Sequence, residues 1–121
     1  MTAYLVINGI LFLVVGLRAL LKPVDAVAEP FDLKVEGVDG LNYLRSGAGG
    51  VAIACGGVIL AGGFVPALAF SGVVLCVTVL GGLVAGRLFS WAVDGQPGAF
   101  PIFSGLLEAL GLGFGVFWLL Q

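Results

Sequence analysis

The sequence LNYLRSGAGGVAIACGGVILAGG, residues 41–63, decides the fold class. It is apolar, rich in glycine, long enough to cross a bilayer as a helix, and contains one charged residue, Arg45. Small residues recur at every fourth position in two rows: Ser46, Gly50 and Ala54, and Ala48, Ala52 and Gly56. Because such rows let helix backbones approach closely in lipid, we expect this helix to contact more than one neighbour.

Three further apolar stretches flank this one, at residues 4–21, 67–91 and 101–120. The chain has 121 residues, of which 60% are hydrophobic and 10% are charged, whereas a soluble domain has about 25% charged residues. So few charges cannot cover a water-exposed surface. We therefore predict an all-α fold: a single integral membrane domain over residues 1–121, built as a four-helix bundle.

The only long polar segment is residues 22–40, between the first two predicted spans. Pro23 can begin a helix and Pro30 can end it, so we expect a short interfacial helix here. All five Lys and Arg residues lie in or beside this loop and the loop 92–100. By the positive-inside rule, both loops are predicted to be cytoplasmic and both termini external.

A layer of charged side chains is predicted inside the bundle. Arg18, Arg45, Arg87 and Glu108 each lie roughly 5–10 Å inside one span, measured from the same side. Charges inside a membrane face the bundle and pair, but three guanidinium groups face one carboxylate. The imbalance predicts a site for an anionic small molecule or a lipid headgroup. The candidate ligand-binding residues are Arg18, Asn42, Tyr43, Arg45, Arg87, Asp94 and Glu108.

Other interpretations of this layer stay open. Glu108 could simply bridge Arg45 or Arg87 and fix the register of the bundle while Arg18 reaches lipid headgroups, or Glu108 could bind a proton. At the level of function, the alternative is a structural or accessory subunit of a larger membrane complex, which would dock partner helices or further copies of itself. The amide of Asn8, in the first span, is expected to bond another helix.

Several functional classes have no support in the sequence. Histidine is absent, which removes the commonest proton relay and most metal sites. Cys55 and Cys76 do not form a C-x-x-C pair and are expected to be buried thiols. No nucleophile–base pair is visible, so we assign no catalytic residue, no cofactor and no metal, and an enzyme is not favoured. The net charge of −2 gives no reason to expect a nucleic-acid partner.

Four motifs together resemble a known family. They are YLVINGILFLVVGLRALLKP at 4–23, GLNYLRSGAGG at 40–50, GRLFSWAVDGQP at 86–97 and the glutamate of the fourth span. The whole chain is similar to small bacterial four-helix membrane proteins known only as a domain of unknown function, within the broader DoxX/DoxD-like group. The resemblance implies a four-helix fold in a bacterial inner membrane and no established activity. Some DoxX-like members are linked to thiol or quinone redox systems, and this sequence has no cysteine pair of that kind.

Overall fold

The protein is all-helical in a computed structural model that describes residues 1–121. Its helices are α1 (Thr2–Leu21), α2 (Val38–Tyr43), α3 (Val51–Phe64), α4 (Pro66–Asp94) and α5 (Ala99–Leu119). The π-helical turns Leu44–Gly50 join α2 to α3, so that Val38–Phe64 is one continuous helix. Four helices are therefore long and apolar enough to cross a membrane. The predicted four-helix membrane fold is confirmed, and the chain is a small multi-pass membrane protein.

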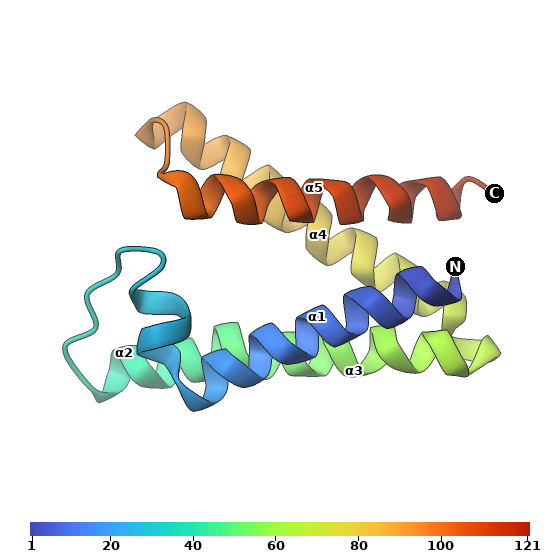
Figure 1. The fold of residues 1–121 in the computed structure, drawn as a ribbon, viewed down its shortest axis with the longest axis horizontal. Coiled ribbons are helices and arrows are strands. Elements are labelled where there is room, and N and C mark those ends of the chain that lie inside the picture. The colour runs from blue at the N-terminus through green and yellow to red at the C-terminus, as the bar shows by residue number, and fades with distance from the viewer.

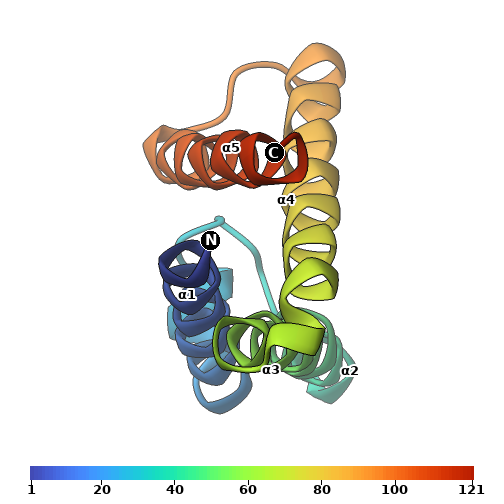
Figure 2. The ribbon, with the colours of Figure 1, turned by 90° about the vertical axis from the view of Figure 1, so that its right-hand side faces the viewer.

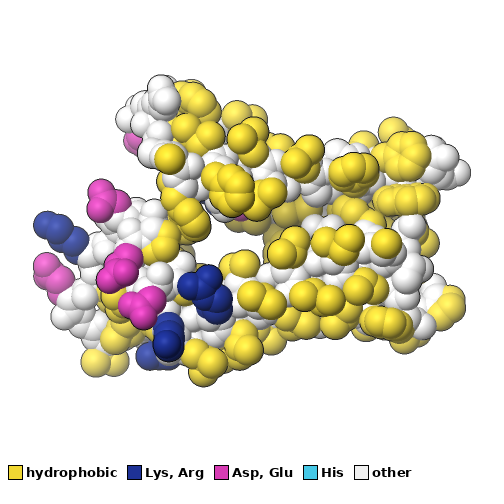
Figure 3. Space-filling view, in the orientation of Figure 1, with side chains coloured by type: hydrophobic (Ala, Val, Ile, Leu, Met, Phe, Trp, Pro, Cys, Tyr) yellow, Lys and Arg dark blue, Asp and Glu magenta, His cyan; other side chains and the backbone are white.

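The four long helices do not pack to the same extent. In Figure 1, α1 and α3 lie side by side, while α4 slants away from them and carries α5 along the other side of the molecule. Figure 2 shows the same arrangement end-on, with α4 joining the α1–α3 pair to α5. Both termini lie at one end (Figure 1), and the charged side chains gather at the opposite end (Figure 3). The bundle is thus closed at the termini and spread at its polar end.

Glycines hold the α1–α3 pair together, at intervals of seven residues. Gly9 and Gly16 of α1 and Gly49, Gly56 and Gly63 of the opposite helix all lie in the contact between the two helices. A methyl group on Gly16 would come within 2.8 Å of a backbone nitrogen of α3, and one on Gly56 within 2.9 Å of a backbone nitrogen of α1. The two backbones are therefore in direct contact, as small residues permit in lipid.

The seam shares only Gly56 with the two four-residue rows predicted from the sequence. Ser46 and Ala54 are exposed, so their row does not face α1. A repeat of seven residues keeps one face of a helix towards a partner over several turns, whereas a repeat of four drifts around the helix. This drift explains why the spacing of seven forms the seam.

The buried core lies near the termini. Tyr4 and Leu5 of α1, Ile59 of α3, and Val73, Cys76 and Leu80 of α4 form one cluster. The Tyr4 hydroxyl donates to the Gly111 carbonyl of α5 at 2.9 Å and lies 3.3 Å from the Cys76 sulfur. Cys76 is buried and Cys55 partly buried, close to what the sequence indicated. All four long helices thus meet at this end.

The connection between α1 and α2 folds back over the polar end. Pro23 precedes a short π-helical turn, Val24–Ala28, and the chain then reverses through Asp32, whose φ of 58° lies in the left-handed region. The predicted short helix is therefore present. The reversal carries Phe31 towards α4 and α5, where it contributes to the site described next.

Candidate functional site

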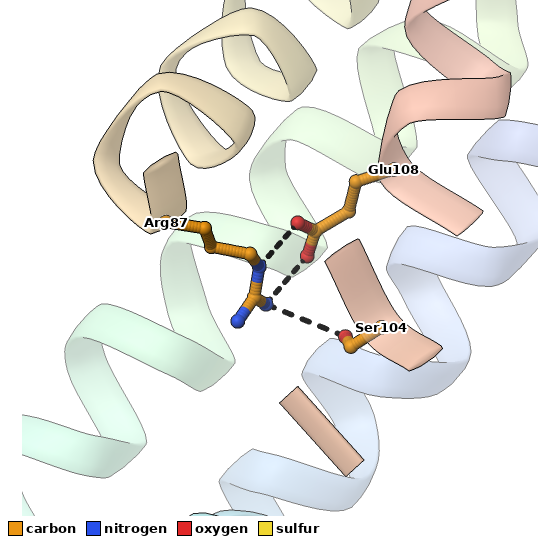
Figure 4. Close-up of polar contacts among 3 residues, drawn as sticks. All are labelled: Arg87, Ser104 and Glu108. Atoms are coloured by element: carbon orange, nitrogen blue, oxygen red, sulfur yellow. Dashed lines mark hydrogen bonds and ion pairs between the residues drawn. The ribbon is translucent and has the colours of Figure 1, made fainter. Parts of the chain in front are cut away.

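One ion pair joins α4 to α5 inside the spread end of the bundle. Arg87 donates from Nε to Glu108 Oε2 at 2.5 Å and from Nη2 to Glu108 Oε1 at 2.7 Å (Figure 4). The pairing is bidentate, which is the strongest geometry for a guanidinium and a carboxylate. The Arg87 side chain keeps 28% of its surface exposed and Glu108 keeps 14%. This pair is the only salt bridge in the protein.

The local sequence of α5 prepares a place for this arginine. Ser104 lies one turn before Glu108 on the same face and accepts a second bond from Arg87 Nη2 at 3.3 Å. Gly105 leaves room for the aliphatic stem, because a methyl group there would come within 3.1 Å of Arg87 Cδ. The arginine therefore lies along α5 without steric conflict.

Phe31 covers the arginine from the polar end. Its ring centroid is 5.6 Å from Arg87 Cζ, which is a cation–π distance. The same ring meets Phe100, at the start of α5, edge-to-face with centroids 5.1 Å apart. Sequence reasoning missed Phe31. The available signal was an aromatic residue directly after Pro30, in a segment otherwise expected to lie on the membrane surface.

One end of the Arg87 guanidinium is free. A guanidinium has five N–H donors, and the bonds to Glu108 and Ser104 use only those on Nε and Nη2. Figure 4 shows the remaining nitrogen, Nη1, pointing away from both partners. No buried side-chain nitrogen lacks a partner, so Nη1 is open to the adjacent space.

A cavity of about 640 Å³, which we call the wedge cavity, lies beside Arg87 between α4 and α5. Arg87 contributes to its wall, and most of the remaining wall is apolar, including Leu83, Leu88, Ile102 and Leu106. Gly82 and Gly86 of α4 face it with nothing within 4 Å of where a side chain would begin. Its volume is within the range of known ligand pockets.

A second, smaller cavity of about 200 Å³ lies on the other side of the ion pair, between α1, α4 and α5. Glu108 and Ser104 contribute to its wall together with Asn8 and Phe12 of α1. Figure 3 shows the molecule hollowed between α5 and the α1–α3 pair. The Asn8 amide donates to the Tyr4 carbonyl of its own helix at 2.9 Å, so the expectation of a bond to another helix is wrong.

The other predicted site residues lie away from the ion pair. Arg45 donates to the Leu20 carbonyl at the end of α1, where the last carbonyls of a helix have no partner of their own. Arg18 is exposed and makes no side-chain hydrogen bond or salt bridge. The charged layer thus divides into one pair within the bundle and two arginines at its surface.

The three remaining candidates also lie outside the wedge cavity. Asn42 and Tyr43 are exposed near the start of the second span, and Tyr43 keeps 74% of its surface accessible. Asp94 accepts a hydrogen bond from Ser90 at 2.9 Å at the end of α4. The structure brings together Arg87 and Glu108, adds Ser104 and Phe31, and does not place the other five candidates beside them.

Comparison with known proteins gives a family for this chain but no activity. Residues 1–119 match the family described as "Domain of unknown function (DUF4345)". The chain belongs to this family. No match was found among curated proteins or among solved structures. What this DUF4345 protein binds must therefore be argued from its own geometry.

Proposed function

We propose that the wedge cavity binds an amphiphile with one apolar chain and an anionic headgroup. The proposal rests on Arg87, a wall residue of this largely apolar cavity whose Nη1 keeps two N–H donors without a partner in the protein. A guanidinium prefers carboxylate and phosphate oxygens, and its donors bind them best where water is scarce. The headgroup would accept from Nη1, which the bonds to Glu108 and Ser104 leave free.

The rest of the wall suits a hydrocarbon chain. Leu83, Leu88 and Leu106 offer apolar contacts, and Gly82 and Gly86 leave an unfilled strip along α4. Burial of a hydrocarbon chain is worth about 0.8 kcal/mol per CH₂ against water, but almost nothing against lipid. The headgroup contact at Arg87 would therefore decide which amphiphile is retained.

We further infer the orientation in the membrane from the charge distribution. The Lys and Arg residues belong to the end that carries the loops 22–40 and 92–100, which supports a cytoplasmic location for that end and external termini. The motif resemblance to DoxX-like proteins is our ground for proposing a bacterial inner membrane. The headgroup at Arg87 would then come from the cytoplasmic leaflet or from the cytoplasm.

Native mass spectrometry of the purified protein tests this function. We expect retention of lysophosphatidylglycerol, which has one chain and a phosphodiester. We expect little retention of inorganic phosphate, which lacks the chain, or of monoacylglycerol, which lacks the charge. The variant Arg87→Gln should lower retention at least tenfold, because it removes the charged donor. Arg45→Gln is the matched control, since Arg45 lies outside the wedge cavity.

A second variant keeps the test decisive if Arg87→Gln folds poorly. Gly86→Leu fills the wedge cavity and leaves the ion pair intact, whereas Gly113→Leu adds the same bulk in open space on α5. Gly86→Leu should abolish retention and Gly113→Leu should not. Equal retention by wild type and both wedge variants, Arg87→Gln and Gly86→Leu, would refute the proposed site. Retention of phosphate alone would instead identify a small-anion site.

One observation favours the alternative function, an accessory subunit. Only 6% of an 18-residue apolar stretch of α5 is buried, compared with 22–28% for the corresponding stretches of the other three spans. A helix so little covered could dock a partner helix. Disulfide cross-linking in native membranes, from Phe114→Cys on the exposed face of α5, would yield a larger adduct if this holds. A monomeric product alone would count against it.

A further inference from the structure

The charge balance at the ion pair has a consequence for any anion that binds there. Arg87 carries one positive charge and Glu108 one negative charge, so the empty site is neutral. A bound monoanion would leave the site with a net negative charge inside the bundle. An uncompensated charge in apolar surroundings is costly, and such a group is neutralised where a proton is available.

No other charged group pairs with Arg87 or Glu108. Asp94 is held by Ser90, a wall residue of the wedge cavity, and would add negative rather than positive charge. From α4, Arg87 faces Glu108. From α1, Asn8 faces the smaller cavity and does not titrate, and α5 itself adds only the Ser104 hydroxyl. The loop before α2 adds Phe31, which is neutral. The walls of the two cavities contain no titratable side chains except Arg87 and Glu108. Arg45 is held at the Leu20 carbonyl.

The two cavities give the two members of the pair different surroundings. Arg87 faces the wedge cavity, and Glu108 faces the smaller cavity with Ser104 and Asn8. The Asn8 side-chain oxygen lies 3.2 Å from where a methyl group on Gly111 would be, one helical turn along α5 from Glu108. Since the Asn8 nitrogen is committed to the Tyr4 carbonyl, this oxygen remains an acceptor. A protonated carboxyl at Glu108 would thus find acceptors on its own side.

We propose that Glu108 is a proton-binding site coupled to anion binding at Arg87, with one proton taken up for each anion bound. The coupling rests on the proposed function, because it needs an anion in the wedge cavity. The anion's oxygen accepts from the Arg87 guanidinium, and the Glu108 carboxylate relinquishes part of its bidentate pairing. A proton from water then forms an O–H bond on the Glu108 carboxyl, which turns towards Ser104 and Asn8. The site is neutral before and after.

Anion binding is expected to be strongest at low pH. The occupied state holds one proton more than the empty state, so lowering the pH favours occupancy. While Glu108 is ionised in the empty protein and protonated in the occupied protein, the apparent dissociation constant rises about tenfold for each unit of pH. A neutral headgroup would give no such dependence, because it adds no charge.

Titration with lysophosphatidylglycerol at several pH values tests the coupling, because its phosphodiester keeps one negative charge throughout. We expect the wild-type dissociation constant to rise about tenfold per pH unit. In Glu108→Gln the positive Arg87 already balances the anion, so binding should be independent of pH and tighter than wild type at the highest pH. A pH slope that persists in Glu108→Gln would overturn the proposal.

A second measurement needs no variant. In weakly buffered detergent solution, wild-type protein should take up one proton for each lysophosphatidylglycerol bound, recorded with a pH indicator dye. Binding without proton uptake would refute the coupling and leave the proposed function standing. Absence of any binding at every pH would refute both. With lysophosphatidylcholine, which has the same phosphate but a compensating cation, the protein should take up fewer protons for each lipid bound.

Discussion

The α1–α3 pair and the α4–α5 pair use glycine in opposite ways. Between α1 and α3, glycines such as Gly16 and Gly56 bring two backbones into contact and leave no space. Between α4 and α5, Gly82 and Gly86 face open space, and a single ion pair spans the gap. Glycine is abundant in both regions, so composition alone does not determine packing. What matters is whether the partner helix presents backbone or a long side chain.

The comparison also shows where function can reside. A seam made of backbone contacts is rigid and has no unsatisfied groups to offer. In the wall of the wedge cavity, Arg87 binds Glu108 through Nε and Nη2 and keeps Nη1 free. We therefore expect the α1–α3 pair to carry stability and the α4–α5 pair to carry binding. Four substitutions test this division, beginning with the largest expected effect.

The first substitution fills the closed seam. Gly16→Val should lower the free energy of unfolding by about 3 kcal/mol, because its side chain would overlap the backbone of α3 and force the helices apart. Gly113→Val, in open space on α5, should change it by less than about 0.5 kcal/mol. Unfolding in a titration with sodium dodecyl sulfate, followed by far-ultraviolet circular dichroism, measures both. Equal effects of Gly16→Val and Gly113→Val would contradict the assignment of stability to the α1–α3 pair.

The second substitution breaks the ion pair. Arg87→Gln should destabilise by about 2 kcal/mol, less than a fully buried pair would, because both side chains are partly exposed. The double variant Arg87→Gln with Glu108→Gln should recover about half of this loss, since no unpaired carboxylate remains. The same unfolding titration measures the cycle. Additive single effects would mean that the pair contributes nothing to holding α5.

The third substitution acts where the two pairs meet. Tyr4→Phe removes the one hydrogen bond from α1 to α5, at the Gly111 carbonyl, and should cost about 1 kcal/mol. Because this contact fixes α5 at the closed end, the variant should also broaden the distance distribution between spin labels on α1 and α5. Tyr43→Phe is the control, since Tyr43 is exposed. An unchanged distribution would show that α5 is held by α4 alone.

The smallest effect concerns the cover of the wedge cavity. Phe31→Ala removes the ring over Arg87 and should cost about 0.5 kcal/mol in stability. It should speed the release of lysophosphatidylglycerol more than it weakens the fold. Phe114→Ala, on the exposed face of α5, is the control. Identical release rates in the two variants would remove Phe31 from the site.

The fold class could be predicted from the sequence because lipid imposes a simple rule on membrane-spanning helices. Each span must be apolar and long enough for the bilayer, so its boundaries are visible in hydropathy. The angles at which helices cross leave no trace in hydropathy. The separation of α4 and α5 from the α1–α3 pair at the polar end therefore could not be predicted. The seven-residue glycine seam was present in the sequence at Gly9, Gly16, Gly49, Gly56 and Gly63, but the four-residue rows beside it obscured it.

The candidate site was only partly visible for a similar reason. Spacing along a helix gives the depth of Arg18, Arg45 and Arg87 but not the direction in which each side chain points. Depth alone placed all three near Glu108, and only Arg87 faces it. Arg45 could reach a free carbonyl at the end of α1, a partner that depth does not reveal.

Diffraction from crystals grown in a lipidic mesophase, at side-chain resolution, tests the central claim most directly. We expect elongated density along Gly82 and Gly86 of α4, with its polar end within hydrogen-bond distance of Arg87 Nη1. The contradicting result is an α5 packed against α1 and α4 with the wedge cavity closed and Nη1 bonded within the protein.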